Sequence, residues 1–228
     1  MRNFTPSLLF GCILLLLVSC SKEKSVDTLG YTPGSSNNGS NNSNNNNNNG
    51  GSSSTGSEIG TWTFINMHAT TLSSVEYNAG GINEKTVTVS DYTTQNNAGT
   101  ITFDGSKMTA TGLAYDVNAT ANTYMYTDNV LDDSLAFPFT ANIPSSTASN
   151  ATYKKVTSDS IYIQSGVFTG MDPNGGTTQG MPAGYRLSWN GDKMYMSMSY
   201  TQTANQVVSG MTQKTTMRIT SVTTLQKK

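Results

Sequence analysis

The chain has 228 residues, only 12% of which are charged, and its formal net charge at pH 7 is −1. That balance gives no sign of the positive charge with which proteins bind nucleic acid. Its two cysteines, Cys12 and Cys20, both lie near the start of the chain. The rest of the chain therefore has no thiol for a disulfide, a metal ligand or a covalent nucleophile.

Residues 1–19 are predicted to be a bacterial secretory signal peptide. Arg2 provides a basic start, residues 8–18 form an apolar run, and Ser19 is a small residue placed directly before Cys20. This layout is typical of a signal peptide that ends in a lipobox. The alternative, a transmembrane helix, is disfavoured because an apolar run of about eleven residues is roughly half of what a bilayer requires.

The same residues resemble those of Gram-negative lipoproteins, in which the lipobox cysteine carries a diacylglycerol and its freed amine a third acyl chain. The resemblance implies an acyl anchor on Cys20 that holds the mature chain to a membrane. The residue after Cys20 is Ser21, and not the aspartate that would resemble an inner-membrane retention signal. We therefore expect an outer-membrane lipoprotein, either periplasm-facing or exposed at the cell surface.

Residues 20–57 are predicted to be the lipidated N-terminus followed by a disordered tether. From residue 35 onward the segment is almost wholly Asn, Ser and Gly. Such a segment has few apolar side chains to bury, so nothing offsets the entropy lost on ordering it. As a flexible coil it would span about 33 Å, which would lift the following domain away from the lipid headgroups.

Residues 58–228 are predicted to form one β domain, because apolar side chains recur at every second position. Tyr185, Leu187 and Trp189 alternate with polar residues before Asn190-Gly191, and Met194, Met196 and Met198 alternate after it. Asn-Gly between two such runs is a strong signal for a β-hairpin. A two-residue turn at Asn190-Gly191 would place Leu187 opposite Met194 and Tyr185 opposite Met196.

A second hairpin is predicted around Asp104-Gly105, with Phe103 opposite Met108 and Ile101 opposite Ala110. No segment of eleven or more residues has convincing helical spacing, and β-branched residues dominate. Residues 171–182 are expected to be the longest exposed loop. We expect an all-β fold, either an antiparallel up-and-down barrel of about 8–10 short strands or a two-layer sandwich. The other predicted strands are residues 61–68, 72–78, 85–92, 124–130, 135–141, 158–165 and 215–225.

Gly60-Thr61-Trp62 resembles the Gly-x-Trp sequence that begins the first strand of lipocalins. The resemblance extends over residues 58–228 in domain length and hairpin order. It implies a lipocalin-like barrel in which Trp62 closes one end. It also implies that a late arginine, here Arg218, packs over the Trp62 ring as a cation on an aromatic face.

Few residues point to catalysis or metal binding. His68 is the only histidine, so a Ser-His-Asp relay or a multi-histidine metal site has at most one imidazole. Asp132 and Asp133 are adjacent, and adjacent strand residues point to opposite faces. Asp172, Asn174 and Asp192 lack the spacing of a calcium-binding loop, and turn chemistry explains them better. We expect no enzyme activity, no cofactor and no metal.

The methionine-rich hairpin leaves two interpretations open. Methionine serves both as adaptable core filler and on surfaces that bind varied partners. Core packing is the simpler interpretation, and a barrel that holds a small apolar ligand is the other. We therefore expect a monomeric, non-enzymatic envelope lipoprotein that binds a small hydrophobic molecule or another envelope component. The alternative is a carbohydrate-binding or adhesive β-sandwich. The candidate ligand-binding residues are Tyr185, Leu187, Trp189, Met194, Met196 and Met198.

Overall fold

The computed structural model describes residues 56–145, 149–164, 166–171, 177–180 and 182–228. The predicted signal peptide, Cys20 and the tether up to residue 55 lie outside the described residues, as do Asp172 and Asn174. Within the described residues the regular elements are all β-strands, paired antiparallel, with no helix among them. The prediction of an all-β fold is confirmed.

The described chain forms twelve strands, and several of them are much longer than the short strands expected from the sequence. β1 alone has 20 residues and joins two strands that the sequence predicted separately. The bounds are β1 (Gly60–Ala79), β2 (Ile82–Thr93), β3 (Gln95–Phe103), β4 (Lys107–Thr127), β5 (Val130–Ile143), β6 (Ser149–Thr157), β7 (Ser160–Ile163), β8 (Gly166–Met171), β9 (Thr177–Gly180), β10 (Ala183–Asn190), β11 (Lys193–Val208) and β12 (Met211–Lys227).

Eight strands pair side by side in a ring, taken in chain order, and the last of them pairs back with the first. β2 and β3 act as one bent strand, since Thr94 between them bonds to Met67 of β1 through its N–H and its hydroxyl, both at 2.9 Å. The members of the ring are β1, β3, β4, β6, β7, β10, β11 and β12.

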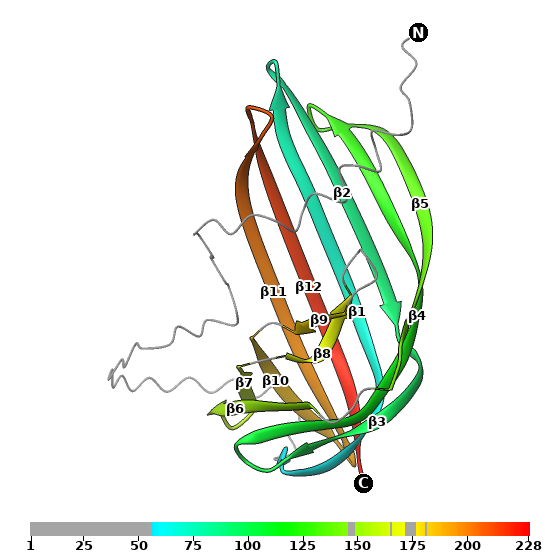
Figure 1. Cartoon of the computed structure of the whole chain (residues 1–228), viewed down its shortest axis with the longest axis vertical. Coiled ribbons are helices and arrows are strands. Elements are labelled where there is room, and N and C mark those ends of the chain that lie inside the picture. The colour runs from blue at the N-terminus through cyan, green and yellow to red at the C-terminus, as the bar shows by residue number, and fades with distance from the viewer. Residues whose placement is uncertain (1–55, 146–148, 165, 172–176, 181) are drawn as a thin grey trace, which may run out of the picture.

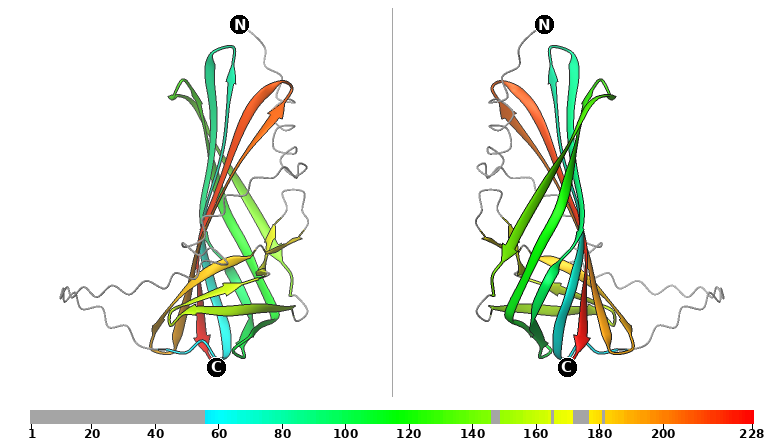
Figure 2. Two further views of the ribbon diagram at one scale, coloured as in Figure 1. Left: turned by 90° about the vertical axis from the view of Figure 1, so that its left-hand side faces the viewer. Right: turned by 90° about the vertical axis from the view of Figure 1, so that its right-hand side faces the viewer.

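Beyond the ring, the longest strands continue together as a single sheet, which we call the extension (Figure 1). The extension has the strand order β11-β12-β1-β2-β4-β5. Its three hairpins, β1–β2, β4–β5 and β11–β12, all end on the same side of the molecule, while the ring and the C-terminus lie at the other end (Figure 2). The molecule therefore has a ring end and a hairpin end.

The ring encloses the hydrophobic core. Alternate residues of its strands point inward, and the largest of them are fully buried, among them Phe64, Phe103, Ile161, Met194 and Met196. Aromatic pairs connect strands that lie two apart in the ring, edge to face, with ring centroids 5.5 Å apart for Phe103–Tyr153 and 5.9 Å for Phe64–Tyr115. The period of two seen in the sequence is thus the period of burial in the ring.

Both hairpin predictions are correct in face, and one of them is wrong in register. Phe103 lies opposite Met108 and Ile101 opposite Ala110, as predicted. In the other hairpin Leu187 lies opposite Met196, not Met194, and Trp189 lies opposite Met194. The prediction was wrong because the turn residues are Gly191 and Asp192, with Gly191 at φ 61°. The pairing therefore shifts by two residues, which leaves every side chain on its predicted face.

The segment from 171 to 182 is not wholly a loop. Its residues Thr177–Gly180 form β9, which pairs with β8 as a separate two-stranded sheet. No sequence pattern predicted this pair, because β9 is a short polar run of Thr, Gln and Gly. The remaining residues of the predicted loop, 172–176 and 181, lie outside the described residues.

Candidate binding surface at the open end of the ring

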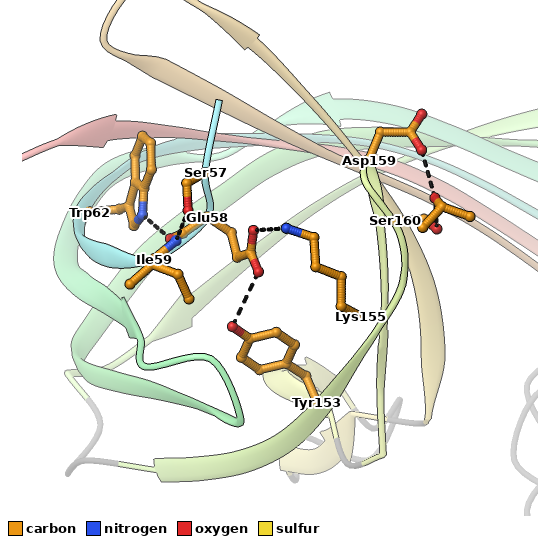
Figure 3. Close-up of polar contacts among 9 residues, drawn as sticks. Ser57, Glu58, Ile59, Trp62, Tyr153, Lys155, Asp159 and Ser160 are labelled. Atoms are coloured by element: carbon orange, nitrogen blue, oxygen red, sulfur yellow. Dashed lines mark hydrogen bonds and ion pairs between the residues drawn. The ribbon is translucent and has the colours of Figure 1, made fainter. Parts of the chain in front are cut away.

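The two ends of the ring differ. At the end farther from the extension, the first residues of the domain run across the ring and close it with polar contacts (Figure 3). Gly56 lies so close to Trp189 that a Cβ at position 56 would come within 2.4 Å of the indole. Glu58 follows, buried, and its backbone carbonyl accepts a hydrogen bond of 2.7 Å from the Trp62 indole N–H. We call this end the sealed end.

The Glu58 carboxylate is the centre of the seal. Lys155 Nζ of β6 lies 2.7 Å from one of its oxygens, and the Tyr153 hydroxyl donates a longer bond of 3.5 Å to the other. Burial, together with the nearby negative charge of Glu58, raises the pKa of Tyr153 to about 12. Tyr153 therefore stays a neutral donor at physiological pH, and the carboxylate is paired with the lysine as a buried acid must be.

Trp62 occupies the sealed end, but the cation over its ring is Lys227 and not the expected Arg218. Lys227 lies opposite Trp62 in the β1–β12 pairing, and its Nζ is 5.2 Å from the ring centroid. Arg218 lies opposite Leu72, about 33 Å further along β1 at the usual rise per residue. The expectation failed because β12 is long, so its arginine reaches the extension. Gly60, at φ 124°, lies beside the Lys227 side chain.

The candidate ligand-binding residues separate into two groups. Tyr185, Leu187, Met194 and Met196 are buried in the core, with Met194 and Met196 0% exposed. Burial also raises the pKa of Tyr185 to about 12. Trp189 and Met198 are only partly buried and pack against this core. The first four residues fill the ring in the described chain, so a ligand there would have to displace them.

At its other end the ring opens into the extension, and here Tyr92, Phe139 and Met198 are only partly buried. Ala69 lies opposite Tyr92, and Ala119 lies opposite Phe139, along one lateral row of the sheet. The Tyr92 and Phe139 rings meet edge to face with centroids 6.2 Å apart. The same row ends at Met198 on β11, which lies opposite Ser221.

The next row toward the hairpin end faces the same way, because it lies two residues further along each strand. Its two ends are aromatic, Tyr200 on β11 and Phe137 on β5, and Phe137 is 48% exposed. Its centre carries hydroxyls, where Thr71 and Ser90 share a hydrogen bond of 2.7 Å. In order the row is Tyr200, Ile219, Thr71, Ser90, Ala121 and Phe137.

We call these two rows the open face. On it the small residues Ala69, Ala119 and Ala121 lie next to the larger Tyr92, Phe137 and Phe139. Burial raises the pKa of Tyr92, which fits a surface of low polarity. The open face therefore combines apolar side chains with hydroxyl groups, next to a core that is already packed. Such a surface suits a small molecule with an apolar body and a polar group.

Most of the open face was not among the candidate residues from the sequence. Met198 was, but Tyr92, Phe137 and Phe139 were not. A signal for two of them existed, because Phe137 and Phe139 alternate around Pro138, and proline within a strand favours an edge position. The buried Glu58 had no sequence signal, since its partners Tyr153 and Lys155 lie far away in the chain.

The polar residues considered as catalytic or metal-binding groups take part in ordinary strand and turn contacts. His68 Nε2 lies 2.7 Å from Asp91 on an exposed surface. Asp132 accepts a bond from the Thr127 hydroxyl, and Asp192 accepts one from Gln226. Among the described residues no group of three or more His, Cys, Asp or Glu could hold a metal ion. Within the same residues no helix is long and apolar enough to cross a membrane.

Comparison with known proteins gives no further assignment. No protein-family model matches the chain, and no curated protein sequence and no solved structure matches it.

Proposed function

We propose that the chain is a non-enzymatic lipoprotein of the bacterial cell envelope, anchored through Cys20, whose β domain is a lipocalin-like barrel that binds a small hydrophobic or amphipathic molecule. The lipobox sequence and the tether support the location. The ring of eight strands, followed in chain order and closed by β1 and β12, supports a barrel over a two-layer sandwich.

The observation that carries the binding proposal is the open face. At the end where the ring is not sealed, its partly buried side chains Tyr92, Phe139 and Met198 pack against the core. We place the ligand there, against Tyr92, Phe137 and Phe139, and not among the buried methionines. Burying one aromatic side chain under a ligand contributes about 1.5–3 kcal/mol.

The alternative, a carbohydrate-binding function, would require exposed aromatic side chains such as Tyr185 and Trp189 as stacking platforms. Tyr185 is buried in the core and Trp189 is partly buried, so this pair offers little surface for a sugar ring. We therefore favour the small hydrophobic ligand.

The test combines native mass spectrometry with probe binding. Chain purified from an envelope fraction should carry a co-purifying small molecule or take up a fluorescent apolar probe. Phe137→Ser should weaken probe binding about tenfold or more, from the loss of about 1.5 kcal/mol or more of apolar contact. Val130→Ser removes an aliphatic side chain that is 66% exposed at a hairpin tip, and serves as the matched control. Equal weakening by both variants, or no binding by the unmodified chain, would contradict the proposal.

A further inference from the structure

Within the part of the chain that the structure describes, the extension has two free edges, and their side chains differ. Among the described residues, β11 beyond Ser197 pairs only with β12, because its pairing with β10 ends at Arg186–Ser197. On the other side, the pairing of β5 is with β4. Unpaired strand edges present rows of backbone N–H and C=O groups that can accept another strand.

The β5 edge carries features that oppose strand addition. Asp132 and Asp133 place two negative charges on it, and Pro138 removes one backbone N–H. Charges and prolines are the usual means by which natural edge strands avoid pairing with another chain.

The β11 edge has none of these features. Residues 199–208 read SYTQTANQVV, with no charge, no proline and no glycine over ten residues. Val207 is 71% exposed and Val208 38% exposed, so the edge also leaves aliphatic surface in water. This edge is therefore suited to pairing with another strand.

The sequence of the edge is complementary to itself. When two copies pair antiparallel about a two-fold axis through Ala204, Tyr200 lies opposite Val208, Thr201 opposite Val207, and Gln202 opposite Gln206. Aromatic–aliphatic and amide–amide pairs of this kind stabilise neighbouring strands, and no like charges meet. The β5 edge, paired with itself, would bring four aspartates into one interface.

From the sequence we expected a monomer. We propose that two copies of this chain pair through residues 199–208 of β11, antiparallel and centred on Ala204, so that their extensions join into one continuous sheet. This inference is independent of the proposed ligand.

Disulfide trapping tests the register. Opposite Cα atoms in an antiparallel pair are about 4.5–5.5 Å apart, within the range that a disulfide bridges. Ala204→Cys in the full chain, expressed in a Gram-negative host, should give a reducible species of twice the chain mass on a non-reducing gel. Gln206→Cys should not, because the two copies of residue 206 would be about 14 Å apart. The unmodified chain, run alongside, controls for Cys12 and Cys20.

A second measurement does not depend on a new thiol. Ala204→Lys would place two positive charges together at the axis and should convert the dimer to monomer in sedimentation analysis. Ala136→Lys, on the β5 edge, is the matched control and should leave the dimer intact. Equal cross-linking at positions 204 and 206, trapping of a different protein by Ala204→Cys, or a monomer for the unmodified chain would each overturn the proposal.

Discussion

The ring and the extension are made of the same strands, yet they hold together differently. In the ring, β1 contributes Trp62 and Phe64, each 2% exposed, to a closed core. In the extension, the same strand carries Thr71, Ser73 and Val75 on a face that neighbouring side chains cover only in part. The comparison indicates that the ring is stabilised by burial, and the extension by backbone pairing and contacts between neighbouring side chains.

The contacts of the extension agree with this division. On one face, Thr71 bonds to Ser90 and Thr88 bonds to Thr123 through their hydroxyls, at 2.7 and 2.9 Å. On the other face, Glu76 lies between Lys85 and Lys214, at 3.2 and 3.7 Å. Each such contact is worth a few tenths of a kcal/mol to about 1 kcal/mol, so the long sheet depends on many small terms.

The largest contrast should come from matched methionines. Met196→Ala in the ring should lower the free energy of unfolding by about 2–5 kcal/mol, because the fully buried side chain leaves a cavity. Met211→Ala, at the β11–β12 hairpin tip, should cost less than about 1 kcal/mol because that side chain is 39% exposed. Urea unfolding of both variants makes the comparison, and similar costs would show that the division between ring and extension is wrong.

Alkaline pH should destabilise the ring. Burial raises the pKa of Tyr185 from 10.0 to about 12, so the folded state keeps a proton that the unfolded state loses. The contribution of Tyr185 to the free energy of unfolding is therefore constant below pH 10. It falls as the pH rises from 10 to 12, by on the order of 2–3 kcal/mol in all.

Tyr185→Phe isolates the effect. The buried Tyr115 and Tyr153, whose pKa values are also raised to about 12, are present in both proteins and cancel. Between pH 9 and pH 11, the free energy of unfolding of the unmodified chain should fall by roughly 1.4 kcal/mol more than that of the phenylalanine variant. A constant difference between the two proteins would argue against the burial of Tyr185.

At the seal around Glu58, losing the lysine should destabilise the fold more than neutralising the acid. The Glu58 side chain is 3% exposed and that of Lys155 is 44% exposed, so only the lysine can be solvated when left alone. Lys155→Met should therefore cost about 1–3 kcal/mol, and Glu58→Gln should cost less. The double variant should recover part of the loss, as measured by thermal unfolding of all four proteins. Equal single-variant costs would mean that the carboxylate is not buried.

The smallest effect is expected in the charge cluster of the extension. Glu76→Gln removes the acid between Lys85 and Lys214, and all three side chains are partly exposed. The expected cost is about 0.5 kcal/mol or less, and it should vanish in high salt. A cost as large as that of the Lys155 variant would show that the extension depends on charge more than on backbone pairing.

The ring could be predicted from the sequence better than the extension. In the ring, apolar and polar residues alternate, so the alternation alone assigns Phe103, Met108, Leu187 and Met196 to one inner face. Register was harder, because the choice of Gly191 and Asp192 as turn residues depends on local backbone conformation. A shift of two residues preserves the pattern, so the pattern could not detect it.

In the extension both faces carry Thr, Ser and Asn, so alternation gives no signal. That is why β1 was predicted as two strands and why the length of β12 was missed, along with the true position of Arg218. The open face was missed for a related reason. Tyr92 and Phe139 are distant in sequence, and only the pairing of β2, β4 and β5 brings their rings together.

The first and last strands of the domain, β1 and β12, begin and end at the sealed end. The backbone N–H of Lys228 bonds to the Thr61 carbonyl at 3.1 Å, and Gly56 rests on Trp189 nearby. An attachment through the N-terminal segment would therefore hold the domain at its sealed end. The three hairpin tips would then be the part of the domain farthest from the attachment point. A fluorescent protein fused after Lys228 would lie beside that attachment point and leave the hairpin tips accessible.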